Sequence, residues 1–191
     1  TRADGTEAVL SKGAAIFQGD SIETGAGAAV GIVFVDATTF SLGESGSMVI
    51  DEMVYDPAAE GGSMAGTITQ GVFSFVSGQI SKSGIDEMTL TTPVATIGIR
   101  GTTGAGQAGA EGTQNSISLL PDAGGSLGEM TITTQSGAPQ VISSVGQTVS
   151  MTSAFLPPPA PIVLTPAQIQ QTYGSALSAL PTPPPLPEQQ Q

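Results

Sequence analysis

Short apolar segments, separated by Gly, Ser and Asp, follow one another from Val9 to about Thr152. Each has the length of one strand, and no long stretch among them has helical periodicity. Regularly spaced short segments are typical of all-β domains. We therefore predict an all-β fold of short strands rolled or stacked into a solenoid-like sheet, with a β-sandwich as the alternative. Further strand candidates are MTLTT (88–92), VATIGI (94–99), SISLL (116–120), EMTITT (129–134), QVISS (140–144) and QTVSMT (147–152).

The segment AVGIVFV, residues 29–35, would be apolar on both faces of a strand. Side chains alternate between the faces, so Ile32 and Phe34 share one face while Val33 and Val35 share the other. We predict that both faces are buried.

The block GTITQGVFSFVSGQI, residues 66–80, places Phe73 and Phe75 on one face of a second strand. Gly71 interrupts the run of side chains. A glycine inside a strand indicates a bulge or a close approach of another backbone, and we predict one of these at Gly71.

Composition changes near Phe155. Ten of the 14 prolines lie between Pro157 and Pro187, and no charged residue occurs from Met130 to Pro187. Proline donates no hydrogen bond to a β-ladder, so this part cannot be another sheet layer. We predict a β-domain over residues 1–154 and a Pro-rich C-terminal segment over residues 155–191.

One short helix is predicted within that segment, over residues 165–180. Thr165 can cap it, and Gln168 completes a capping box. Four apolar side chains then recur at helical spacing, and a short helix must bury such a stripe to be stable. We expect the stripe to dock on the β-domain, with LPPPAP as an extended strap. Its members are Ile169, Tyr173, Leu177 and Leu180.

The chain has 16 acidic and 4 basic residues, a net charge of −12, and neither cysteine nor histidine. This charge disfavours nucleic acid and anionic membranes as partners. The missing residue types are the usual zinc ligands, thiolate nucleophiles and triad bases. We therefore expect no catalytic activity, no cofactor and no membrane insertion. The expected partners are another protein, neighbouring domains of the same chain or a second copy.

Residues 91–109, TTPVATIGIRGTTGAGQAG, spell G-x-G-x-x-G at Gly104, Gly106 and Gly109. A dinucleotide site needs these glycines at a strand-to-helix turn. No helical pattern follows Gly109, so we predict a strand and its turn here and no phosphate site.

Arg100 stands at the end of the apolar run before these glycines. If Ile97 and Ile99 face the core, Arg100 lies on the opposite face of the strand. We predict a structural ion pair stronger than an exposed one, with recognition of a partner as the alternative role. The candidate carboxylates are Asp36, Glu44 and Asp51.

Two polar clusters remain as minor candidates. Asp51, Asp56 and Glu60 lie in an oxygen-rich stretch that could bind calcium, although EF-hand spacing is missing. Ser81 and Lys82, with Ser83 as the other hydroxyl, could form a Ser-Lys dyad, but a solvated lysine stays charged and is a poor base. We predict no catalysis there.

Two ordered motifs resemble the FecR domain family. TPVATIGIRGT, residues 92–102, resembles the family's closing motif. GDSIETGAGAAVGIVFVDATTFSLGESGSMVI, residues 19–50, resembles its opening core of a Gly-Asp, a Thr-Gly, a hydrophobic strand, an Asp-containing turn and another strand. The resemblance covers about residues 17–103 and implies a non-enzymatic, extracytoplasmic β-domain in a bacterium.

Two functions are compatible with this resemblance. Since the chain begins at Thr1 without a methionine and ends in a proline spacer, we expect a portion of a longer protein. The preferred function is a protein-interaction or scaffold module of a cell-surface or secreted, adhesin-like protein. The alternative is the periplasmic sensor domain of a FecR-type regulator, which relays the state of an outer-membrane receptor to a sigma factor.

Overall fold

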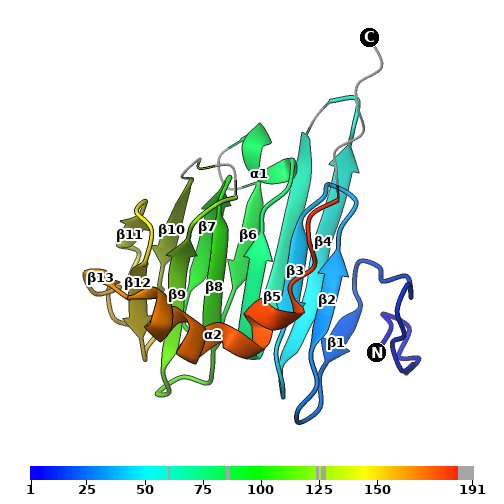
Figure 1. The fold of residues 1–191 in the computed structure, drawn as a ribbon, viewed down its shortest axis with the longest axis horizontal. Helices are drawn as coiled ribbons and strands as arrows, with labels where there is room; N and C mark the ends of the chain where they lie inside the picture. Colours follow the sequence, from blue (N-terminus) through cyan, green and yellow to red (C-terminus); the bar gives the residue numbers. More distant parts are fainter. Residues whose placement is uncertain (60, 85–86, 124, 126–127, 185–191) are drawn as a thin grey trace.

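The structure is a computed structural model that describes residues 1–59, 61–84, 87–123, 125 and 128–184. Its elements confirm the prediction of an all-β fold with one helix near the C-terminus (Figure 1). They are β1 (Ser21–Glu23), β2 (Val30–Val33), β3 (Thr39–Leu42), β4 (Ser47–Asp56), β5 (Gly61–Val76), α1 (Ile80–Ser83), β6 (Met88–Thr91), β7 (Thr96–Arg100), β8 (Thr103–Ala108), β9 (Asn115–Leu120), β10 (Glu129–Thr133), β11 (Pro139–Ile142), β12 (Gln147–Met151), β13 (Ile162–Val163) and α2 (Pro166–Ala179).

The strands form two layers of one rolled sheet. The first layer has the order β1-β4-β5-β6-β7-β10-β11, and the second has the order β2-β3-β5-β8-β9-β12-β13. Because the chain passes repeatedly from one layer to the other, the winding is solenoid-like while the packing is that of a sandwich. In Figure 1, β1 and β2 lie at the right end of the roll, and β11 and β13 lie at the left end.

The long strand β5 joins the two layers. Its first part pairs with β4 and β6, and from Gly71 onward it pairs with β8. Gly71 has φ +105°, which favours glycine, and a Cβ there would come within 2.6 Å of the Gly46 Cα. The predicted close approach at Gly71 is therefore confirmed, and it is the point at which the strand changes layers.

One hydrophobic core lies between the layers. Its most deeply buried aromatic residues, Phe40, Phe73 and Phe75, come from the second layer and meet aliphatic residues such as Ile68 and Ile97 from the first. The rings of Phe40 and Phe73 stack with their centroids 6.0 Å apart. The period-2 pattern of the sequence thus identified the inward face of these strands.

The prediction that both faces of residues 29–35 are buried is wrong for one face. Ile32 and Phe34 are buried, but Val33 is 50% exposed and Val35 is 77% exposed. In the described part of the chain β2 pairs with β3 alone, at the edge of the second layer. The C-terminal end of α2 and Pro181 cover the outward face of β2 only near Gly31, so Val33 and Val35 stay exposed.

Candidate functional site

Residues 1–19, here called the arm, precede β1 and form no strand. Asp20 anchors them: its carboxylate accepts hydrogen bonds from the Arg2 guanidinium at 2.6 Å and from the Phe17 backbone N–H at 2.9 Å. The same guanidinium donates to the Ala15 carbonyl at 2.9 Å and lies 5.1 Å from the centre of the Phe17 ring. These contacts fold both ends of the arm onto β1.

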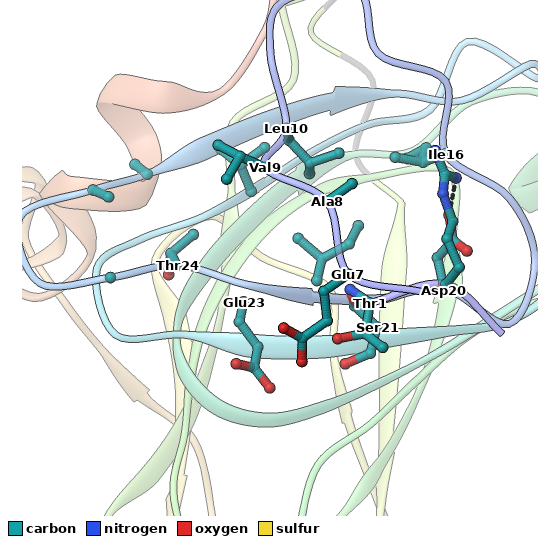
Figure 2. Close-up of a pocket in the computed structure, with 16 residues that line it drawn as sticks. Thr1, Glu7, Ala8, Val9, Leu10, Ile16, Asp20, Ser21, Glu23 and Thr24 are labelled. Atoms are coloured by element: carbon teal, nitrogen blue, oxygen red, sulfur yellow. Dashed lines mark hydrogen bonds and ion pairs between the residues drawn. The ribbon is translucent and has the colours of Figure 1, made fainter. Parts of the chain in front are cut away.

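Between its two ends the arm arches over a groove of about 570 Å³ (Figure 2). Ile16, Ile22 and Val30 give the groove apolar walls. Val9 and Leu10 also line it from the arm, although Val9 is 99% exposed. The strands that line the groove, β1 and β2, lie at the right end of the roll in Figure 1.

The groove is acidic as well as apolar. Arg2 and Asp20 pair with each other, whereas Glu7 and Glu23 make no hydrogen bond or ion pair with the described residues. In the described chain there is no cluster of three or more side chains that could hold a metal ion. Chemically, the groove can bind apolar and basic groups.

Sequence reasoning missed this groove. The strand pattern predicted from Val9 onward is wrong for residues 9–19, which form no strand, and nothing in the sequence indicated how this segment folds back. The available signal was local: Val9-Leu10 is an apolar pair with Glu7 before it and Ser11 and Lys12 after it. Two apolar residues are too few to complete a strand, and an apolar pair left outside the sheet is a candidate contact surface.

Arg100 pairs with Glu129, which lies directly opposite it in the register of β7 and β10. The three carboxylates named from the sequence are engaged elsewhere. Asp36 accepts hydrogen bonds from Thr38, Glu44 from the Gly27 N–H and Asp51 from the Thr67 hydroxyl. The predicted partners were therefore wrong, because only the sheet register decides which acid faces Arg100.

We expect Arg100→Ala to lower the free energy of unfolding by at most about 1 kcal/mol. The side chains of Arg100 and Glu129 are each 35% exposed, so water screens their attraction. This loss of stability is smaller than the loss expected from the sequence, which predicted a strong structural ion pair. Thermal melts of Arg100→Ala and Glu129→Ala measure it, and a loss several times larger would contradict the screened geometry.

Two glycines of the G-x-G-x-x-G pattern leave room for phenyl rings of the core. Gly104 and Gly106 lie within β8, opposite Phe75 and Phe73 of β5. A Cβ on Gly106 would come within 2.3 Å of the Phe73 ring, and one on Gly104 within 2.6 Å of the Phe75 ring. The phenyl rings occupy the space that side chains would need. These two glycines therefore lie in a strand, whereas the sequence prediction placed them in the turn after the strand of residues 94–99.

Helix α2 lies across the outer face of the second layer, over β3, β5 and β8 (Figure 1). The predicted capping box of Thr165 and Gln168 is present at its start. Ile169 and Tyr173 are buried against Ala105 and Leu120, while Leu177 and Leu180 are half-buried. The structure thus places the apolar stripe on the β-domain. The boundary near residue 155 stays a prediction.

Small polar side chains line the surface of the second layer against which α2 packs. The Tyr173 hydroxyl lies 2.9 Å from the hydroxyls of both Ser116 and Ser118. The Ser41 hydroxyl donates to the Ala176 carbonyl at 2.8 Å. Burial raises the pKa of Tyr173 above its ordinary value, and the two serine hydrogen bonds oppose that rise in part. Serine at these outward positions lets the helix come close to the sheet.

Among the described residues, neither minor candidate is assembled as a site. Asp51 and Asp56 lie on β4, five residues apart, which separates them by about 16 Å along a strand. Glu60 lies outside the described residues. In α1, the Ser81 and Ser83 hydroxyls donate to the backbone carbonyls of Gly78 and Ile80, so neither is held by Lys82.

The described residues hold no helix with the length and apolar character needed to span a membrane. Among protein families, the model described as FecR protein matches residues 20–121, more than half of the 191 residues. No curated protein matches the chain.

Solved structures with a similar fold include two of a protein described as a candidate anti-sigma factor from Parabacteroides distasonis ATCC 8503. The TM-scores are 0.51 and 0.53, and the sequence identity is 12% in each case. Each match covers 70% of this chain and 55% of that protein, so the chain corresponds to about half the length of its structural relative. At this identity the likeness concerns the fold alone.

Proposed function

The chain belongs to the FecR family, and from this membership we propose that it is the extracytoplasmic sensor module of a FecR-type regulator. In this role it binds another protein and passes that protein's state on to a sigma factor. The observation that carries the proposal is the match over residues 20–121, which spans β1 to β9 and so most of the rolled core. The structural relative, described as a candidate anti-sigma factor, supports the same class.

The adhesin-like surface protein, preferred from the sequence, has no support among the related proteins. That preference rested on the proline spacer that follows the β-domain. This spacer lies outside the matched residues, and it does not distinguish a regulator from a surface protein. An interaction module agrees with the groove and the exposed arm, because both present surfaces that another protein can contact.

The extracytoplasmic location can be tested with cysteine labelling, because the chain has no cysteine of its own. We expect Val9→Cys in the full-length protein to react with a membrane-impermeant maleimide in cells with a permeabilised outer membrane, since Val9 is fully exposed. Val149→Cys is the matched control: Val149 is buried, so it should react only after denaturation. Labelling of Val9→Cys only in lysed cells would place the domain in the cytoplasm.

Signalling can be tested through transcription. Phe75→Asp puts a charge into the core and should unfold the domain, whereas Val35→Asp changes an exposed side chain of the same layer. In cells that make the full-length protein, RNA sequencing should show an altered set of sigma-dependent transcripts for Phe75→Asp alone. Unchanged transcripts, together with lost attachment of the cells to a surface, would support the adhesin-like function instead.

A further inference from the structure

We propose that the groove beneath the arm binds a short extended segment of the partner protein, one that carries aliphatic and basic side chains. This inference rests on the proposed function in one respect, namely that the partner is a protein. It adds where on the chain that partner binds and which chemistry its binding segment has.

The size of the groove sets the length of the segment. A volume of about 570 Å³ lies within the usual range of small-ligand sites, about 300 to 1,000 Å³, and accommodates only a few side chains. Ile16 and Val30 remain partly exposed inside it, so apolar surface is still in contact with water. An aliphatic side chain that displaces this water gains the free energy of burial.

The charge of the groove selects basic side chains. Glu7 and Glu23 both line it, and Figure 2 shows their carboxylates on the same side of the arm. Neither has a partner among the described residues, whereas the nearby Arg2 and Asp20 already satisfy each other. The net charge of −12 adds a wider negative field. A lysine or arginine therefore finds two open carboxylates, and an acidic segment is repelled.

The edge of β2 favours an extended backbone. The Phe34 N–H donates to the Thr38 carbonyl, and bonded pairs alternate along an antiparallel ladder. Gly31 and Val33 consequently direct their backbone groups away from β3, at an edge that has no other strand in the described chain. The groove runs past the start of this strand, since Ala29 and Val30 line it. An extended segment can add to such an edge while its side chains enter the groove.

Three synthetic hexapeptides test the proposal by isothermal titration calorimetry at physiological salt. They are acetyl-KVKVKV, acetyl-KSKSKS and acetyl-EVEVEV. We expect acetyl-KVKVKV to bind most tightly, acetyl-KSKSKS to bind about tenfold more weakly, and acetyl-EVEVEV not to bind. Backbone amide shifts of the labelled chain should change at Ile22, Val30 and the arm. Shifts confined to other surfaces, or equal binding of all three peptides, would overturn the proposal.

Matched variants separate the groove from general attraction to an acidic protein. Glu7→Gln/Glu23→Gln should weaken acetyl-KVKVKV about fivefold. Asp51→Asn/Glu52→Gln removes the same charge from exposed positions outside the groove and should have less than a twofold effect (roughly the limit for screened charges). Val9→Ser should weaken binding more than Val35→Ser, which lies outside the groove. Equal losses in the two charge variants would mean diffuse attraction.

The peptide measurements remain separate from the tests of the proposed function. If the peptide binds in the groove but Val9→Cys is labelled only in lysed cells, the proposed binding site stands and the regulator function is rejected. If Val9→Cys is labelled in permeabilised cells and Phe75→Asp alters the transcripts, but no peptide binds, the regulator function stands and the proposed binding site is rejected.

Discussion

Tyr173→Ala should lower the free energy of unfolding by about 4 kcal/mol, as for other large aromatic residues removed from a core. Tyr173 is fully buried, and it is the centre of the contact between α2 and the second layer. Its loss leaves a cavity and also leaves the Ser116 hydroxyl without its partner. Denaturant unfolding measures the change. An unchanged midpoint would show that α2 contributes nothing to the stability of the β-domain.

Tyr173→Phe separates the hydroxyl from the ring. It keeps the packing but removes the hydrogen bonds to Ser116 and Ser118, so we expect a smaller loss of about 1.5 kcal/mol. Tyr55, the other of the two tyrosines, is only partly buried and supplies the matched control. Tyr55→Phe should have little effect on stability. Equal losses in both variants would argue against a special role for the Tyr173 hydroxyl.

The same hydroxyl makes stability depend on alkaline pH. Burial raises the pKa of Tyr173 in the folded chain above its ordinary value of 10.0. As the pH rises through that value, the unfolded chain loses the phenolic proton first, so the folded state loses relative stability until its own raised pKa is reached. This loss should be present in the wild type and in Tyr55→Phe, and absent in Tyr173→Phe. Denaturant midpoints across this pH window measure it.

Gly106→Ala should lower the free energy of unfolding by about 3 kcal/mol, the upper end for overpacked cores. The added Cβ would lie 2.3 Å from the Phe73 ring and 2.9 Å from the Ser116 carbonyl oxygen. Neither the ring nor the strand backbone can move freely, because Phe73 is fully buried and stacked on Phe40. The melting temperature of the purified variant reports the change.

A double variant tests whether the clash with the ring is the cause. Phe73→Leu shortens the side chain over Gly106, so Gly106→Ala should cost less in that background than in the wild type. Gly25→Ala is the matched control, since a Cβ at Gly25 meets nothing within 4 Å. If the losses of stability from Phe73→Leu and Gly106→Ala simply add, the clash with the ring is not the cause. Gly106 would then be required for another reason, such as its backbone conformation.

Much of the fold follows from local patterns. The alternation at Phe73 and Phe75 identified the core face, and the Thr165 to Gln168 spacing identified the start of α2. These signals are readable because each depends on residues within one turn or one strand. The FecR resemblance was likewise visible in two ordered motifs, whose residues form β1, β2, β3, the start of β4 and β7.

The misses share one cause, which is distance along the chain. β8 was not among the strand candidates because its Gly-Ala-Gly run has low strand propensity, and it is held in place by the phenyl rings of β5. The pairing of Arg100 with Glu129 depends on a register between strands 29 residues apart. The groove depends on Arg2 reaching Asp20 across the arm.

The sequence by itself determined the fold class, the inward faces of the strands, the helix and its cap, and the exclusion of histidine and cysteine chemistry. Only the tertiary structure decided that β5 changes layers at Gly71, that Phe73 fills the space beside Gly106, and that the arm encloses an acidic groove. Hydrophobic periodicity and capping depend on residues close together in the chain, so both can be identified from the sequence. Register, layer changes and grooves arise from contacts between distant segments, and those are fixed only when the whole chain packs.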